Sequence, residues 1–249
     1  FLQQSQQLLQ RILNIKDRAL GTLYLEQCEQ ALKLLQQSEI EQKRQGKTLM
    51  QQVADKGYFL AQYHYGYLLK EGFFDDKDEA LAREYLEKAS VHHIAACIDY
   101  GFMLLNGVGG PEDKAKGKSY IALAAQRGSS KAMHYYALIL FEERNIEESI
   151  KWMKKSADCG LTLSCYSYGK MLAEEMGEGG NISEAEYYLH LSTFDQALVT
   201  NATTLLQRIH RLKCAFDEFK SVAKQDSFNA PHYQQFVIEE KLPEDRALL

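Results

Sequence analysis

The feature that most constrains the fold of this chain is a pattern that recurs four times along it. Each copy reads small-x-x-x-Tyr-small and has a leucine three residues after the second small residue. These second small residues, called the central residues below, are Gly66, Gly101, Ala137 and Gly169. They are separated by 35, 36 and 32 residues. Because recurrence at about 20 to 50 residues is typical of solenoids, the spacing predicts an array of similar units.

A second block precedes each copy and predicts a second helix. In it an aromatic residue or a leucine is followed four and five residues later by small or slender residues and then by a turn. The clearest example has Tyr120, Ala124, Ala125 and Gly128. The turn positions 57, 93, 128 and 160 keep the phase of the central residues. We therefore expect each unit to be an antiparallel helix pair, with the central residue on helix A and the second block on helix B.

The recurring glycines predict close packing and helix ends. A glycine inside a helix costs about 1 kcal/mol relative to alanine, so its recurrence calls for a packing reason. Small residues at positions such as Ala61 and Gly66 let a neighbouring helix approach closely. Three pairs have the spacing of N-terminal capping boxes: Asp76 with Glu79, Asn145 with Glu148, and Ser183 with Glu186. Three glycines suit the left-handed conformation of a helix C-cap: Gly57, Gly128 and Gly160.

The repeated unit resembles the Sel-one-like repeat (SLR), a relative of the tetratricopeptide repeat. The second unit carries the resemblance most fully, at Ala96, Tyr100, Gly101, Leu104, Gly107, Tyr120, Ala124, Ala125 and Gly128. The third unit departs from it, with Ala137 for the glycine and no glycine-rich turn. The resemblance implies an all-α fold: a right-handed α/α solenoid of about four helix pairs, with helical caps at both ends.

Four segments follow from this interpretation. Residues 1–48 form an N-terminal helical cap or a degenerate repeat, and residues 49–192 form the solenoid. Residues 193–223 are predicted as a C-terminal capping helix because their apolar side chains recur at three- and four-residue steps. Residues 224–249, which hold two prolines, form a C-terminal tail.

Charge and hydropathy restrict the partners. The net charge is −5, so no general basic field exists to hold a nucleic acid backbone, and we expect no nucleic-acid partner. The longest uninterrupted apolar stretch, residues 135–141, is far shorter than the roughly 20 residues of a membrane span. The sequence begins at Phe1 rather than methionine, which would fit removal of an N-terminal segment such as a signal peptide. The compartment stays open, with the bacterial periplasm slightly favoured over the cytoplasm.

Catalytic and metal-binding patterns are weak. The five cysteines form no Cys-x-x-Cys pair, and the seven histidines form no His-Glu-x-x-His motif, so we expect no metal and no cofactor. Two segments echo the end of a P-loop, at residues 46–48 and 117–119, but glutamates stand where the first glycine is required. A hydrolase using a thiol or a histidine stays an alternative, and a cysteine within hydrogen-bond reach of a histidine in one cleft would favour it.

One face of the A helices is the candidate partner-binding face. It comprises positions three before, one after and four after each central residue, which cluster opposite the small residues. In helix-pair solenoids the A helices line the concave surface, and aromatic content suits the centre of an interface. The competing interpretation is that these side chains bury against neighbouring helices or the C-terminal segment. The predicted residues are Tyr63, Tyr67, Lys70, Ile98, Phe102, Leu105, His134, Leu138, Phe141, Tyr166 and Lys170.

The sequence thus predicts a non-catalytic solenoid that holds another protein as an adaptor or inhibitor. The resemblance implies a bacterial immunity protein that neutralises a secreted antibacterial effector as one alternative, or a role in assembling an envelope complex. A homo-oligomer formed through residues 1–45 is a further possibility.

Overall fold

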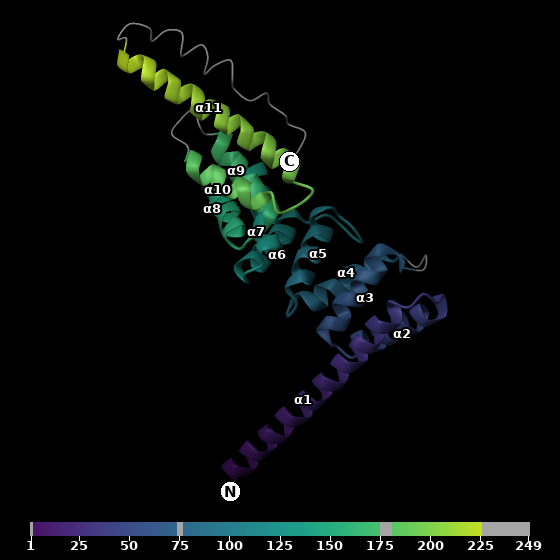
Figure 1. Cartoon of the computed structure of the whole chain (residues 1–249). Helices are drawn as coiled ribbons and strands as arrows, with labels where there is room; N and C mark the ends of the chain where they lie inside the picture. The colour runs from purple at the N-terminus through teal and green to yellow at the C-terminus, as the bar shows by residue number, and fades with distance from the viewer. Residues whose placement is uncertain (1, 74–76, 175–180, 226–249) are drawn as a thin grey trace. The chain divides into compact units, whose positions relative to one another are not determined.

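The computed structural model of the chain describes residues 2–73, 77–174 and 181–225, with side chains over 19–73, 77–174 and 181–214. All regular structure in these residues is helical, which confirms the predicted all-α class (Figure 1). Consecutive helices pack as sequential pairs, as expected for an SLR α/α solenoid. The helices are α1 (Leu2–Leu35), α2 (Ile40–Asp55), α3 (Phe59–Glu71), α4 (Glu79–Ser90), α5 (Ile94–Leu105), α6 (Lys114–Gln126), α7 (Ser130–Glu142), α8 (Ile146–Asp158), α9 (Thr162–Glu174), α10 (Ile182–Ser192) and α11 (Val199–Gln225).

The chain divides into two compact units, residues 1–132 and residues 133–249. The predicted solenoid segment 49–192 is therefore shared between them, and each unit is described here by itself. Unit 1 contains α1 to α6, and unit 2 contains most of α7 and all of α8 to α11. The A helices are α3, α5, α7 and α9, each followed by its B helix.

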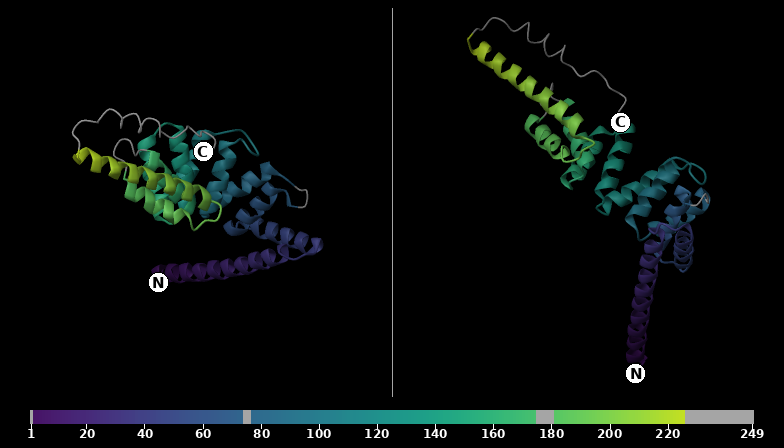
Figure 2. Two further views of the ribbon diagram at one scale, coloured as in Figure 1. Left: turned by 45° about the horizontal axis from the view of Figure 1, so that its top comes forward. Right: turned by 45° about the vertical axis from the view of Figure 1, so that its right-hand side comes forward.

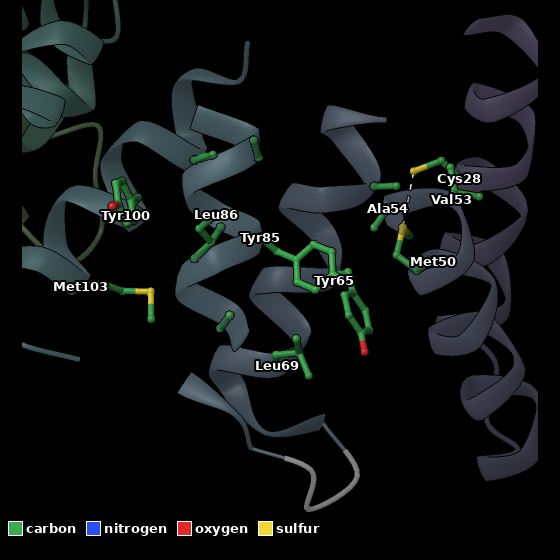
Figure 3. Packing of buried hydrophobic residues seen from close by; sticks show 14 of the residues in the cluster. Cys28, Met50, Val53, Ala54, Tyr65, Leu69, Tyr85, Leu86, Tyr100 and Met103 are labelled. Carbon is green, nitrogen blue, oxygen red and sulfur yellow. Dashed lines mark hydrogen bonds between the residues drawn. The ribbon is translucent and has the colours of Figure 1, made fainter. Parts of the chain in front are cut away.

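The core of unit 1 runs from helix to helix instead of gathering at one centre. Met50 and Val53 of α2 lie fully buried between α1 and α3, and the Cys28 thiol lies 3.6 Å from the Met50 sulfur (Figure 3). Leu86 of α4 and Tyr100 of α5 extend the same cluster along the chain. This distribution is what a stack of helix pairs requires, because each pair buries its apolar face against its neighbours.

The central glycines lie where two helices of a pair meet. A Cβ added at Gly66 would lie 3.2 Å from the backbone oxygen of Ala82 on the partner helix. The corresponding distance is 3.1 Å at Gly101, to Gly117 O, and 3.1 Å at Gly169, to the carbonyl of the α10 residue at position 185. Side chains crowd these positions as well, with Ile121 Cγ1 2.8 Å from the same point at Gly101. The recurrence of glycine therefore comes from close helix contact, as the sequence predicted.

The third pair shows how an alanine is accommodated. The stretch from its central residue to the facing residue of helix B is four residues shorter than in the second pair, so Ser149 takes the place of Gly117 and Met153 takes the place of Ile121. The Ser149 hydroxyl donates to Ala137 O at 2.7 Å, across the α7–α8 contact. Met153 is fully buried but unbranched, and methionine fills irregular space more readily than leucine or isoleucine. We attribute the tolerance of Ala137 to this exchange.

Each pair also contains one edge-to-face aromatic contact at the same register. The tyrosine before the central residue meets an aromatic residue of helix B with ring centroids 4.8–5.4 Å apart and planes at 79–88°. Such contacts contribute about 0.5–1.5 kcal/mol each beyond the area they bury. The four pairs are Tyr65 with Tyr85, Tyr100 with Tyr120, Tyr136 with Trp152, and Tyr168 with Tyr188.

The ends of the helices agree with the sequence only in part. Gly57, Gly128 and Gly160 have φ of 87°, 93° and 82°, which confirms the left-handed turn at each. The predicted capping boxes are wrong in detail. The N-cap of α4 is Asp78, whose carboxylate accepts from Leu81 N, while Asp76 lies outside the described residues. The helix α10 begins one residue before Ser183 and is capped by Asn181, and Asn145 caps α8 without a side-chain hydrogen bond.

The flanking helices differ in how much of them packs. Within unit 1, α1 contacts α2 through its C-terminal half, and its N-terminal half extends away from the other helices of the unit (Figure 2). Within unit 2, α11 contacts α10 and α9, so it covers the last pair as a cap would. It begins at Val199, six residues after the start of the predicted capping segment, because residues 193–198 form turns.

Candidate partner-binding surface

In unit 1 the predicted face belongs to a larger cluster of aromatic rings. Tyr63 and Tyr67 lie one turn apart on α3, with ring centroids 6.5 Å apart. The Tyr63 ring stacks on His93 at 4.3 Å, with 29° between the planes. His93 lies 6.2 Å from Phe59, which in turn lies 5.4 Å from Tyr58. The six rings that we call the aromatic surface are Tyr24, Tyr58, Phe59, Tyr63, Tyr67 and His93.

The aromatic surface is accessible but rigid. Tyr67 is 41% exposed, and the other five rings are partly exposed. Tyr58 and Tyr63 also pack against the buried cluster of unit 1, which limits their rotation. Tyrosine supplies large contact area with little loss of side-chain entropy, and it is enriched in interface hot spots. The arrangement is therefore suited to binding another protein.

Charges border this surface at Lys70. Its ammonium nitrogen lies 3.0 Å from Asp99 Oδ1, 3.5 Å from Glu71 Oε1 and 5.0 Å from the centre of the Tyr67 ring. Burial opposes the charge on Lys70, but the two carboxylates outweigh burial and raise its pKa. Lys70 is thus held in place and stays charged, so it offers a partner a fixed cation beside an aromatic ring.

His93 has a structural role that its position in the sequence does not reveal. It is the N-cap of α5, and its ring nitrogen Nδ1 accepts a hydrogen bond from Ala96 N at 3.4 Å. This bond requires Nδ1 to be unprotonated. Burial lowers the pKa of His93, against the opposing charge of Asp99, which favours the neutral ring that the cap needs. The cap holds the ring on which Tyr63 stacks.

Of the remaining predicted residues of unit 1, one is buried and two are partly exposed. Ile98 is only 7% exposed, because α5 packs against both α4 and α6. The prediction that Ile98 contacts a partner is therefore wrong for the structure as it stands. Phe102 and Leu105 are partly buried. Leu105 also lies against Gly117, since a Cβ at that glycine would be 2.8 Å from Leu105 Cγ. Ile98 is therefore the buried member of the predicted face in unit 1, whereas Tyr67 is exposed and the other four members are partly exposed.

In unit 2 one predicted residue turns inward. His134 is 4% exposed and its Nδ1 lies 2.9 Å from the Ser164 hydroxyl, which lies 2.6 Å from the Ser156 hydroxyl. Burial lowers the pKa of His134. It belongs to a buried polar network of α7, α8 and α9 and offers nothing to a partner, which corrects the expectation for this residue.

The other four predicted residues of unit 2 are partly exposed. Leu138 and Tyr166 rest against the buried cluster of the unit, and Phe141 is partly exposed. Lys170 lies 3.8 Å from Glu174. Compared with unit 1, this part of the face has fewer ring contacts.

One cysteine–histidine contact among the described residues bears on the hydrolase alternative. Cys214 Sγ lies 3.7 Å from His210 Nε2, one turn apart on α11, and both side chains are exposed on the helix surface instead of lying in a cleft. Cys97 and Cys165 are buried, and burial raises the pKa of both thiols, which opposes the thiolate that a nucleophile needs. The contact on α11 does not meet the condition of a shared cleft.

The described residues form neither a metal site nor a P-loop. No group of three histidine, cysteine or carboxylate side chains comes together in this part of the chain. The segments 46–48 and 117–119 that echo a P-loop lie inside α2 and α6, where the backbone amides are used within the helix. None of the described helices is both long and apolar enough to cross a bilayer.

The sequence analysis missed four of the six rings of the aromatic surface. Tyr24 lies on α1, Tyr58 and His93 are the N-cap residues of α3 and α5, and Phe59 is the first residue of α3. None of them is at an A-helix position that periodicity selects. One signal pointed to them: the turns at 57 and 93 share a register, so residues just after one turn lie near the other in adjacent pairs.

Comparison with known proteins identifies the repeats. The Sel1 repeat family matches three stretches, residues 60–90, 94–129 and 130–161. The fourth pair, α9 with α10, lies beyond these stretches but keeps the same contacts at Gly169 and between Tyr168 and Tyr188. No curated protein matches the sequence.

Solved structures give the same fold. A Sel1 repeat protein from Oxalobacter formigenes is 18% identical with a TM-score of 0.54, over 59% of this chain and 63% of that one. A protective antigen with an SLR fold, present in uropathogenic Escherichia coli strains, is 20% identical with a TM-score of 0.60, over 68% and 38%. This chain therefore matches less than two thirds of the length of each of these two solved proteins. An immunity protein from Pseudomonas aeruginosa is 15% identical over 75% and 82%, but its TM-score of 0.35 carries no argument.

Proposed function

We propose that this chain, in which three stretches match the Sel1 repeat, is a non-catalytic scaffold that holds a partner protein at the predicted face of its A helices. The observation that carries the proposal is the aromatic surface of unit 1. Six rings form a continuous chain of contacts in which Tyr67 is 41% exposed and the other five are partly exposed. Clustered tyrosines beside a fixed lysine match the composition of interface centres.

The proposal assigns contact with the partner to the exposed and partly exposed members of the face. In unit 1 these are Tyr63, Tyr67, Lys70, Phe102 and Leu105, and in unit 2 they are Leu138, Phe141, Tyr166 and Lys170. The immunity role implied by the sequence resemblance has no supporting feature among the described side chains. We therefore propose the scaffold role alone.

The test compares two exposed tyrosines in quantitative affinity purification from the native host. Tyr67→Ala removes the most exposed ring of the aromatic surface. Tyr187→Ala is the matched control, because Tyr187 is 59% exposed on the B helix α10, away from the predicted face. Both variants are expected to keep the circular dichroism spectrum and melting temperature of the wild type.

We expect a partner that copurifies with the wild type and with Tyr187→Ala to fall at least tenfold with Tyr67→Ala. A hot-spot tyrosine contributes about 2 kcal/mol or more, which gives a change of this size. Equal recovery with all three proteins would contradict the proposed surface. A reaction catalysed by the purified wild type would contradict the non-catalytic assignment.

A further inference from the structure

Unit 1 contains a cavity on the other side of α3 from the aromatic surface. Its volume is about 640 Å³, within the range of about 300–1,000 Å³ typical of ligand sites. Successive residues on a helix are rotated by about 100°, so Tyr65 and Leu69 face away from Tyr63 and Tyr67. The cavity is lined by Arg44, Lys47, Thr48, Gln51, Tyr65, Leu69, Lys77 and Asp78.

The lining combines a basic rim with an apolar floor. Arg44, Lys47, Thr48 and Gln51 recur at three- and four-residue steps along one face of α2. Tyr65 and Leu69, each 4% exposed, lie one turn apart on α3 (Figure 3). They form the floor of the cavity. The exposed groups are polar, whereas the buried ones supply a ring and a branched aliphatic chain. A ligand that fills this cavity therefore needs both charge and apolar surface.

The charge at the rim is opposite to that of the chain as a whole. Three cations and one carboxylate line the cavity, although the net charge of the chain is −5. The Asp78 carboxylate already accepts from Leu81 N as the cap of α4, and Lys77 lies 2.6 Å from Glu79. Lys47 donates to Phe73 O at 3.4 Å. Arg44 forms no ion pair with any described residue, unlike the lysines at positions 70, 116 and 154.

We propose that this cavity binds a short acidic peptide segment of a partner protein, with an apolar side chain between its carboxylates. The carboxylates of the peptide pair with the guanidinium of Arg44 and with the ammonium group of Lys47. Arginine is suited to this because it binds carboxylates in a bidentate manner. The apolar side chain rests on Tyr65 and Leu69. A free inorganic anion would satisfy the rim but leave the floor and most of the volume unused. The cavity shares no residue with the aromatic surface, so it is a second site.

The experiment is isothermal titration calorimetry on the full chain with capped pentapeptides. The probe is Glu-Glu-Leu-Glu-Glu, and two matched peptides replace either its glutamates by glutamine or its leucine by glycine. We expect the probe to bind at least tenfold more tightly than the glutamine peptide and several-fold more tightly than the glycine peptide. Raising the salt concentration from 50 to 300 mM is expected to weaken the probe, because exposed charges are screened. A separate titration with inorganic phosphate measures whether the cavity binds a free anion.

Variants locate the binding. Arg44→Gln with Lys47→Gln is expected to weaken the probe at least tenfold. Lys33→Gln with Lys114→Gln removes the same charge from exposed positions of unit 1 outside the cavity and is expected to have little effect. Equal loss in both double variants, or equal binding of the glutamate and glutamine peptides, would overturn the proposal. Phosphate binding as tight as that of the probe, with no benefit from leucine, would overturn it as well.

Discussion

Replacing a central glycine by alanine tests whether close helix contact explains the repeats. At Gly101 the new methyl group would lie 2.8 Å from Ile121 Cγ1 and 3.1 Å from the backbone oxygen of Gly117. Both distances are shorter than the roughly 3.5–4.0 Å optimum for carbon contacts, and overpacking of this kind costs about 1–3 kcal/mol. The gain in helix propensity offsets about 1 kcal/mol. We expect a net loss of up to about 2 kcal/mol.

Gly21→Ala is the matched control for this substitution. Gly21 also lies inside a helix of unit 1, but a Cβ there would meet nothing within 4 Å. It is expected to stabilise by up to about 1 kcal/mol through propensity alone. The difference between the two variants therefore isolates the packing cost. Urea unfolding followed by circular dichroism at 222 nm measures it, and equal stabilisation by both alanines would refute the reasoning.

A second substitution tests the account of Ala137. Met153 is the residue of the third pair that corresponds to Ile121, so Ile121→Met is expected to relieve the crowding created by Gly101→Ala. In a double-mutant cycle we expect a favourable coupling of about 0.5–2 kcal/mol. Strict additivity of the two changes would show that the residue at position 121 does not decide whether alanine is tolerated.

Three further predictions concern single groups. Burial lowers the pKa of His134 in the folded chain, so as the pH falls below about 6.5 the unfolded state takes up a proton first. The contribution of neutral His134 to the free energy of unfolding of unit 2 is therefore fully present above that pH. Below it, this free energy falls by up to about 1.4 kcal/mol for each pH unit, until the pKa of His134 in the folded state is reached. Urea unfolding followed by Trp152 fluorescence at pH 7.5 and 5.5 is expected to show a larger loss for the wild type than for His134→Gln, and equal losses would contradict this. Asp78→Ala is expected to cost about 1 kcal/mol of stability through loss of the α4 cap, and Asn145→Ala clearly less, by urea unfolding; equal costs would contradict the assigned caps. Under native conditions a thiol reagent is expected to label two cysteines and to reach the other three only after unfolding; fast labelling of more than two would contradict the burial of the thiols. The labelled pair is Cys159 and Cys214, and the protected three are Cys28, Cys97 and Cys165.

The repeat and the cause of its glycines could be predicted from the sequence, because a glycine that recurs inside a helix indicates close packing at that position. The spacing of Gly66, Gly101 and Gly169 requires a helix contact at a fixed register, and the structure has that contact in each case. The aromatic pairs follow from the same register. Helix starts were less predictable, because Asp76, Asp78 and Asn181 all have side chains able to cap, and local geometry chooses among them.

The candidate site was only partly predictable, since exposure depends on neighbours in other pairs. Periodicity placed Tyr63 and Ile98 at equivalent positions, yet Tyr63 is partly exposed whereas Ile98 is only 7% exposed. His134 shares that face and is drawn inward by Ser164, which lies 30 positions away in the sequence. The basic rim of the cavity had no motif, because it depends on Lys77 meeting one face of α2.

Site-specific photocrosslinking tests the central claim most directly. A photoreactive phenylalanine is placed at Tyr67 in one protein and at Tyr187 in another, and each is irradiated in the native host. The scaffold account predicts a discrete crosslinked partner from position 67 that is absent from position 187 and is lost when unlabelled wild-type protein competes. The same crosslinked product from both positions, or none from position 67 while the partner still copurifies, would contradict it.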